Sequence, residues 1–319
     1  DHRHLEAYYG AFGDRLFTDF EDDFLRQDIQ SRLLGRLLSP RYWLSDYGPG
    51  SDRTEMVVKY YEETIFRGAT FNDINLDGGP FIEINATDLA TGLRFSFSQE
   101  RFDLLCSDLG SFPLARAVTA SSAVPGVFPS VAIENHADQC DLSETQEWQL
   151  MSRIDQAAEG ALQKSMTETI LSYRNAEERP FIHLIDGGIS DNLGLRALID
   201  RYNLLSDHQF ERLGDHMPRH VLIILVNAEV KRDRRIEQSP NPPSISRTMA
   251  TLTNIQMLRD NIETKEKLER AIAAFNQRAG EQGIDTRVYF IEVGFDTVHY
   301  PEVNKALNNM PTSLTLEDE

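Results

Sequence analysis

The apolar segment FIHLI at residues 181–185 runs directly into Asp186-Gly187-Gly188, and a helical pattern follows it. An apolar run of this length, bounded by turn residues, predicts a buried strand. A carboxylate at the carboxyl end of such a strand lies where open α/β sheets form their sites. Aspartate is also frequent in turns. From the residues alone, Asp186 therefore fits a functional group and a structural turn residue equally well.

The residues beside Asp186 have local explanations. Gly187 and Gly188 allow either a close approach of the backbone or a positive φ. Asp191 or Asn192 can cap the helix predicted over 193–202, because a side-chain oxygen there accepts hydrogen bonds from unpaired backbone N–H groups. Capping does not explain Asp186, which precedes the helix by several residues.

Strands alternate with helices along the chain, which favours an α/β fold. HVLIILVNAEV at 220–230 predicts a buried parallel strand, and RVYFIEVGF at 287–295 predicts a last strand. Between them a long helix is expected over about 244–279, with a break or bend within it. We expect one domain over 1–319, built on a mainly parallel central sheet.

The first half of the chain contains further elements. Helical patterns cover 5–38 and 55–66, and FIEIN and LRFSFS, joined by ATDLATG, predict a β-hairpin within 81–98. Residues 131–180 are expected to form an insertion at the surface, with a polar part at 134–147. A helix is expected within that insertion, in AAEGALQKSMTETILSY.

Charge and composition exclude several classes of protein. The chain has 51 acidic and 32 basic residues, a net charge of −19, which argues against nucleic acid as a partner and against simple electrostatic docking on anionic lipid. No apolar run approaches the ~18 residues of a membrane span. Cys106 and Cys140 are the only cysteines and lack CxxC spacing, so we expect two separate thiols, with a single bridge as the alternative.

A partial calcium loop is present. Asp73, Asn75, Asp77 and Gly78 match its first half, but Ile84 occupies the twelfth position, where the loop needs a bidentate acid. We therefore expect no metal.

The usual nucleotide and hydrolase motifs are missing. Neither GxGxxG nor GxxxxGK[ST] occurs, which removes the main support for a nucleotide site. The G-x-S-x-G elbow of serine hydrolases is also absent: Ser190, in GISDN, lacks the last glycine, and Ser121 and Ser122, in ASSAVPG, lack both. His183 alternates with apolar residues, so we expect a packed histidine; as a general base it would indicate an unrelated α/β hydrolase.

Four blocks taken together are similar to the bacterial patatin-like phospholipases. They are AYYGAFGDRLFTDFEDDFL, INATDLATGLRFSFS, ARAVTASSAVPGVFPS and LIDGGISDNLG, in the family's order and at roughly its distances. The resemblance covers residues 7 to about 230. It implies a three-layer α/β/α fold and a Ser–Asp dyad that hydrolyses acyl esters of lipids. It also implies that Asp186 is the general base, with Gly187 and Gly188 forming the active-site turn.

The chain departs from the family at its beginning. By the alignment, the G-x-S-x-G nucleophile and the Gly-rich oxyanion loop belong ahead of residue 1. We expect a chain truncated at both ends, whose intact form is a serine acyl-ester hydrolase. The alternative is a non-catalytic module of the same fold that binds lipid or another partner.

The implied reaction needs no metal or organic cofactor. Asp186 would accept the serine proton during attack on the ester carbonyl, and would then activate water to release the fatty acid. A dry pocket beside the small-residue helix 115–123 would raise the pKa of the carboxyl. A lipid or phospholipid ester is the implied substrate, with peripheral contact to a membrane, and Phe112, Val127 and Phe128 are candidates for an apolar groove.

Overall fold

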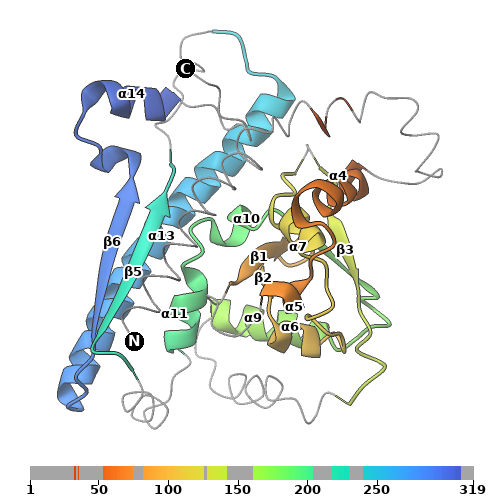
Figure 1. Ribbon diagram of the computed structural model, residues 1–319, viewed down its shortest axis with the longest axis horizontal. Helices are drawn as coiled ribbons and strands as arrows, with labels where there is room; N and C mark the ends of the chain where they lie inside the picture. Colours follow the sequence, from red (N-terminus) through yellow and green to blue (C-terminus); the bar gives the residue numbers. More distant parts are fainter. Residues whose placement is uncertain are drawn as a thin grey trace.

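The computed structural model describes residues 32–33, 35, 53–74, 82–125, 128–141, 161–203, 217–229 and 240–309. These residues form a mixed α/β fold with two separate sheets (Figure 1). In chain order the elements are α4 (Arg53–Tyr61), the π-helix η3 (Glu62–Phe66), α5 (Phe71–Ile74), β1 (Ile84–Asp88), β2 (Arg94–Phe97), α6 (Gln99–Asp103), α7 (Leu114–Ser121), β3 (Val131–Glu134), α9 (Ala161–Ser172), β4 (Phe181–Ile185), α10 (Gly188–Asp191), α11 (Arg196–Asn203), β5 (His220–Asn227), α13 (Ile245–Glu281), β6 (Arg287–Gly294), the 3₁₀ helix η6 (Phe295–Thr297) and α14 (Pro301–Asn309).

The larger sheet has four strands in the order β2-β1-β4-β3, and every neighbouring pair is antiparallel. β1 and β2 form the predicted hairpin, with Ile84 opposite Phe97. β4 is the predicted strand 181–185 and lies between β1 and β3. The expected mainly parallel sheet is not found in the described residues. Periodicity indicates that a segment is a strand, but it does not fix the direction of its partners.

The smaller sheet is a parallel pair that includes the parallel strand predicted at 220–230, but the predicted burial of this strand is wrong, because Leu222, Ile224 and Val226 are exposed. β5 and β6 run side by side from His220 opposite Arg287 to Asn227 opposite Gly294. A parallel pair needs a long crossover, and α13 provides it. α13 is one α-helix of 37 residues, so the expected break within it is absent.

Each sheet has its own apolar core. Aromatic residues fill the core of the antiparallel sheet, where Phe95 contacts Phe97 and Phe102 edge to face. A second core lies between the parallel pair, α11 and α13, and includes Leu225 and Leu268. α10 and α11 lie between the two halves in Figure 1, so the segment after β4 connects them.

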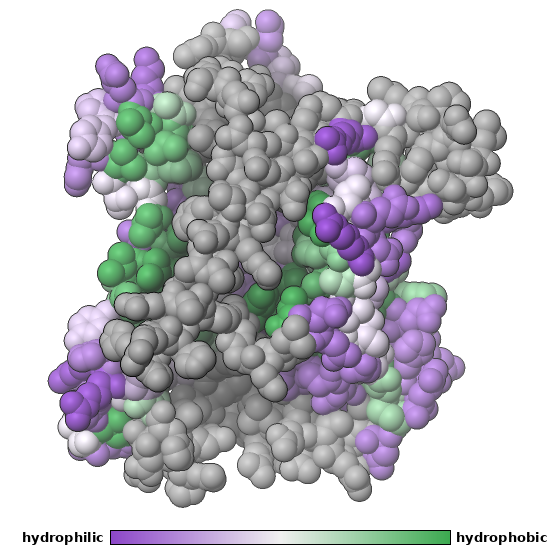
Figure 2. Space-filling model, viewed as in Figure 1, coloured by the Kyte–Doolittle hydropathy of each residue, from purple (hydrophilic) through white to green (hydrophobic). Residues whose placement is uncertain are grey.

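The other face of the parallel pair is open. Alternate residues of β5 and β6 are about half exposed or more: Leu222, Ile224, Val226, Tyr289, Ile291 and Val293. In Figure 2, apolar side chains gather over β6. Parallel strands are usually covered on both faces, so this exposure is unusual for the type of sheet.

Residues 131–180, expected to be a surface insertion, contribute to the fold at both ends. β3 pairs with β4 over its whole length, from Val131 to Glu134. The helix predicted within the stretch is α9, and Ile170 and Tyr173 lie in the core. The polar residues 142–160 lie outside the described part of the chain, as do most of the helix predicted over 5–38 and three of the four calcium-loop positions.

Within the described ranges, no helix is both long enough and apolar enough to cross a membrane.

Candidate active site

Asp186 follows β4, one of the two inner strands of the antiparallel sheet, and three backbone hydrogen bonds hold it in place. The Asp186 N–H donates to the Ala123 carbonyl (3.0 Å), and the Gly187 N–H donates to the Ser121 carbonyl (3.0 Å). The Thr87 hydroxyl on β1 donates to the Asp186 carbonyl (2.8 Å). The residues that accept the first two bonds come from the small-residue segment at the end of α7, which allows the two backbones to approach closely.

Position 187 needs a glycine because there is no room for a side chain, and not because of its backbone angles. Its φ is −64°, which any residue adopts. A Cβ atom at this position would lie 2.4 Å from the Asn85 carbonyl oxygen on β1. Of the two explanations that the sequence left open, the close approach of the backbone is the correct one here.

The Asp186 carboxylate is held through one oxygen. Oδ1 accepts a hydrogen bond from the Gly188 N–H (2.8 Å). Among the residues that the structure describes, no hydrogen bond reaches Oδ2. Burial raises the pKa of Asp186, and the Gly188 N–H opposes this shift only in part. A partly buried carboxylate with a raised pKa and one free oxygen has the properties of a general base.

The hydroxyl groups nearest in sequence are engaged elsewhere. Thr87 is 1% exposed and donates to the Asp186 carbonyl. Ser190 Oγ lies 2.8 Å from Thr87 Oγ1 and also donates to the Gly187 carbonyl (3.4 Å). Ser122 Oγ donates to the Val118 carbonyl (2.9 Å). No serine or threonine hydroxyl in the described ranges hydrogen bonds to the Asp186 carboxylate.

Asp191 has the capping role that the sequence predicts. It is 5% exposed, and its two oxygens accept the N–H groups of Leu195 (3.1 Å) and Arg196 (3.0 Å) at the start of α11. The helix begins at Arg196, three residues later than expected. Burial raises the pKa of Asp191, and Arg94, whose Nε lies 4.0 Å from Oδ2, opposes that shift. Asn192 is exposed and contacts α13 instead.

His183 is not the packed histidine that we expected. Its side chain is exposed, and its Nδ1 lies 3.0 Å from Ser130 Oγ. The reason is that the face of β4 that carries His183 and Phe181 is open in the described part of the chain; Phe181 is 50% exposed. Nothing in this geometry connects His183 to the Asp186 carboxylate.

Two of the three candidate groove residues are placed by the structure. Phe112 packs against the core of the antiparallel sheet, and Phe128 packs against the cluster formed by α4 and α7. Val127 lies outside the described residues. Phe112 and Phe128 are therefore partly buried residues that pack against the apolar core.

Sequence reasoning missed a buried ion pair close to the site. Asp88, the last residue of β1, is completely buried and bonded to Arg179 Nη2 (2.7 Å) and to the Tyr173 hydroxyl (3.0 Å). Its second oxygen accepts the Ala90 N–H (3.0 Å). Burial is the largest cause of the raised pKa of Tyr173. The only sequence signal was the aspartate in ATDLATG, which we interpreted as a turn residue.

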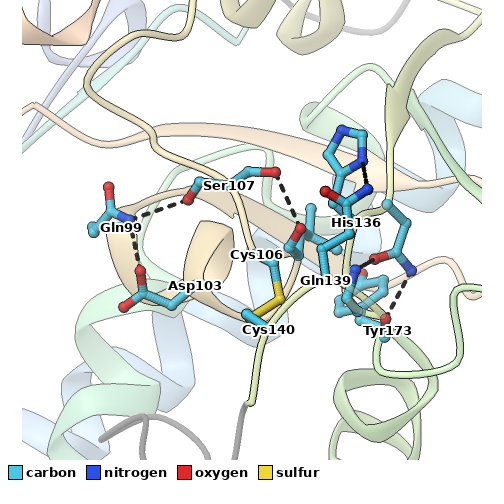
Figure 3. Close-up of a disulfide and its surroundings, with 11 residues drawn as sticks. Gln99, Asp103, Cys106, Ser107, His136, Gln139, Cys140 and Tyr173 are labelled. Atoms are coloured by element: carbon cyan, nitrogen blue, oxygen red, sulfur yellow. Dashed lines mark hydrogen bonds between the residues drawn. A yellow bond between two sulfur atoms is a disulfide. The ribbon is translucent and has the colours of Figure 1, made fainter.

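The two cysteines form a disulfide, so the expectation of separate thiols was wrong. Cys106 and Cys140 are 34 residues apart in the sequence and their Cα atoms lie 5.9 Å apart (Figure 3). The Leu105 carbonyl accepts the His136 N–H (3.1 Å), which places the two loops side by side. Spacing alone could not show this, because the contact depends on how β3 returns along the sheet.

A metal site is not evident in the part of the chain that the structure describes, where no three His, Cys, Asp or Glu side chains are grouped to hold an ion. Asp73, the first position of the partial calcium loop, instead accepts hydrogen bonds from Thr70, from the backbone N–H (2.7 Å) and from the hydroxyl (3.1 Å). These bonds lower the pKa of Asp73. Asn75, Asp77 and Gly78 lie outside the described residues.

No protein family model, no curated protein and no solved structure matches this chain.

Proposed function

We propose that the intact protein is a lipid acyl hydrolase of the phospholipase A or esterase type, in which Asp186 is the general base of a Ser–Asp dyad. The observation that carries this proposal is the half-engaged carboxylate of Asp186, which has one oxygen on the Gly188 N–H and one oxygen without a hydrogen bond in the described residues. The order of the four patatin-like sequence blocks supports it.

The nucleophile of the proposed dyad is a serine ahead of residue 1, where the motif order puts it. During acylation, Asp186 Oδ2 would accept the serine proton as the serine oxygen attacks the ester carbonyl, and the alcohol would leave with that proton. During deacylation, Asp186 would take a proton from water, the hydroxide would attack the acyl-enzyme, and the serine would recover its proton as the fatty acid leaves.

The proposal also includes the detailed fold of the intact protein. We infer a three-layer α/β/α arrangement of patatin type for the intact protein. The mixed α/β content and the strand, Asp-Gly-Gly turn and helix at residues 181–203 support it. The proposed substrate is a lipid or phospholipid ester, with the protein in peripheral contact with the membrane that contains it.

The test is the Asp186→Asn variant of the intact protein. Asparagine has the same shape and retains an oxygen for the Gly188 N–H, but it cannot accept the serine proton. Hydrolysis of p-nitrophenyl butyrate and of phospholipid vesicles should fall by about 10²–10⁴-fold, the usual contribution of a general base.

The matched control is Asp191→Asn, a second buried aspartate five residues away. It should lower the melting temperature, because Asp191 caps α11, and it should leave most of the activity of the folded protein intact. Full activity in Asp186→Asn would refute the proposal. An intact protein that binds phospholipid vesicles without hydrolysing either substrate would instead identify the non-catalytic module.

A further inference from the structure

The long helix α13 contacts the turn that carries Asp186. A Cβ atom on Gly188 would lie 3.2 Å from Met257 Cε on α13 and 2.8 Å from Asn192 Oδ1. One turn further along α13, Asp260 forms an ion pair with Arg196 at the start of α11. Both α10 and α11 therefore contact α13, an element that begins more than 40 residues later in the sequence.

A chain of side-chain amides lies at this contact. Asn192 Nδ2 donates to Asn261 Oδ1 (3.2 Å), and Asn261 Nδ2 donates to Glu229 Oε2 (3.3 Å). Glu229 follows β5, so the chain connects α10 to the carboxyl end of the parallel pair. Asn261 is 3% exposed. A buried amide is costly unless it is hydrogen bonded, and both ends of the Asn261 amide are used.

We propose that Asn261 is a positioning residue for the candidate base: by holding Asn192, which follows the last residue of α10, it fixes this four-residue helix and so the Gly188 N–H that faces the Asp186 carboxylate. This inference rests on the proposed function for its consequence in catalysis. Its structural part concerns only Asp186, Gly188, Asn192 and Asn261.

The expected effect follows from the geometry of the turn. The backbone of Asp186 and Gly187 is tied to β1 and α7. Gly188 is the first residue of α10, which is held at this end by the Asp191 N–H on the Gly187 carbonyl (3.0 Å) and at the other end, through Asn192, by α13. If α10 is released from α13, the Gly188 N–H moves away from Oδ1 and the carboxylate loses its one hydrogen bond from the described residues. The remaining influence is burial, so the pKa of Asp186 should rise.

The first experiment is an NMR titration of the Asp186 carboxyl carbon in the 319-residue chain. We expect its midpoint to move to higher pH in Asn261→Leu, which removes both amide bonds. Asn192→Ala breaks the same link at an exposed position, so it should give the same shift and decides the question if Asn261→Leu does not fold.

The matched control is Asn276→Leu on the same helix. Asn276 also uses both ends of its amide, on the N–H (2.9 Å) and the carbonyl (3.0 Å) of Val288, but these bonds hold α13 to β6. This variant should lose stability without a change in the Asp186 titration. If Asn261 had only a structural role, Asn261→Leu would behave like Asn276→Leu: the protein would lose stability and the Asp186 titration would not change.

The second experiment separates positioning from the proposed reaction. In the intact protein, Asn261→Leu should lower kcat by about 10–100-fold with little change in KM, and should move the acidic limb of the pH profile upward. An unchanged Asp186 titration in both Asn261→Leu and Asn192→Ala would overturn the inference. A shifted titration in an intact protein without esterase activity would overturn the proposed function alone.

Discussion

Asp88 and Asp186 lie at the ends of neighbouring strands of one sheet, yet their surroundings are opposite. Asp88 is completely buried, and its oxygens are bonded to Arg179, Tyr173 and the Ala90 N–H. Asp186 is partly buried, and in the described residues only the Gly188 N–H contacts its carboxylate. The first carboxylate is neutralised and fixed, whereas the second keeps an oxygen that can accept a proton. The difference separates a structural aspartate from a candidate base more clearly than sequence context does.

The backbones of both aspartates are firmly held, and at Asp88 the N–H donates to the Leu93 carbonyl (2.9 Å) and the carbonyl accepts the Gly92 N–H (2.7 Å). The chain at Asp186 is tied to α7 through two N–H groups and to β1 through its carbonyl, while the side chain is left open. A preorganised site requires a rigid backbone that carries a functional group still able to react, here the Asp186 carboxylate.

The largest effect on stability should come from removing the partner of Asp88. Arg179→Met leaves a fully buried carboxylate without its countercharge, which costs about 3–5 kcal/mol. Urea unfolding of the 319-residue chain measures it. The control is Arg116→Met, whose ion pair with Glu55 (2.7 Å) is partly exposed and should contribute at most about 1 kcal/mol. If the two variants lost the same free energy of unfolding, the buried ion pair would contribute no more to stability than the partly exposed one.

Reduction of the Cys106–Cys140 disulfide should have the next largest effect. A cross-link between residues 34 apart restricts the unfolded chain and stabilises the fold by about 2–4 kcal/mol. We expect a lower urea midpoint when dithiothreitol is added. The Cys106→Ser/Cys140→Ser double variant should show the lower midpoint under both conditions. The Asp186 titration should not move, because in the described residues no hydrogen bond or ion pair joins the disulfide loops to that turn; a shift would couple the two regions.

Adding one methyl group at the Asp186 turn should be costly as well. In Gly187→Ala, the new Cβ would lie 2.4 Å from the Asn85 carbonyl, so β1 or the turn must move, at a cost of about 1–3 kcal/mol. Gly280→Ala is the control: a Cβ there meets nothing within 4 Å, and because the position is in the last turn of α13, the change should be neutral or stabilise the helix by at most about 0.5 kcal/mol. Thermal unfolding of both variants measures the difference, and a stable Gly187→Ala protein would contradict the close approach.

The smallest effect concerns the charge of Asp186. Because burial raises its pKa in the folded protein, the folded state binds the proton more tightly than the unfolded state does. Stability from this group is therefore full at low pH and is lost as the pH rises through the folded pKa. Asp186→Asn should be slightly more stable than the wild type at neutral pH, and the difference should vanish at acid pH. If Asp186→Asn were instead less stable than the wild type at neutral pH, a neighbouring group would have to stabilise the charged Asp186 carboxylate.

Local elements were predictable because their causes are local. The β1–β2 hairpin follows from alternation around ATDLATG, and β5, α13 and β6 follow from their apolar patterns. The cap at Asp191 also follows from residue type and position, whereas at Gly187 the sequence left a close approach and a positive φ open. Long-range partners were not predictable. The antiparallel direction of β3 and β4, the exposure of His183 and the disulfide depend on contacts between segments about 30 to 50 residues apart.

By itself the sequence determined that an aspartate stands between a strand and a helix, with glycines that permit a tight turn. It left open whether that aspartate belongs to the fold or to a site, because the same residues serve both. Only the tertiary structure decided which carboxylate is neutralised: Arg179 reaches Asp88, and no cation in the described residues reaches Asp186. The physical reason is that the pKa and availability of a carboxylate depend on burial and on neighbouring charges, and segments far apart in the chain supply both.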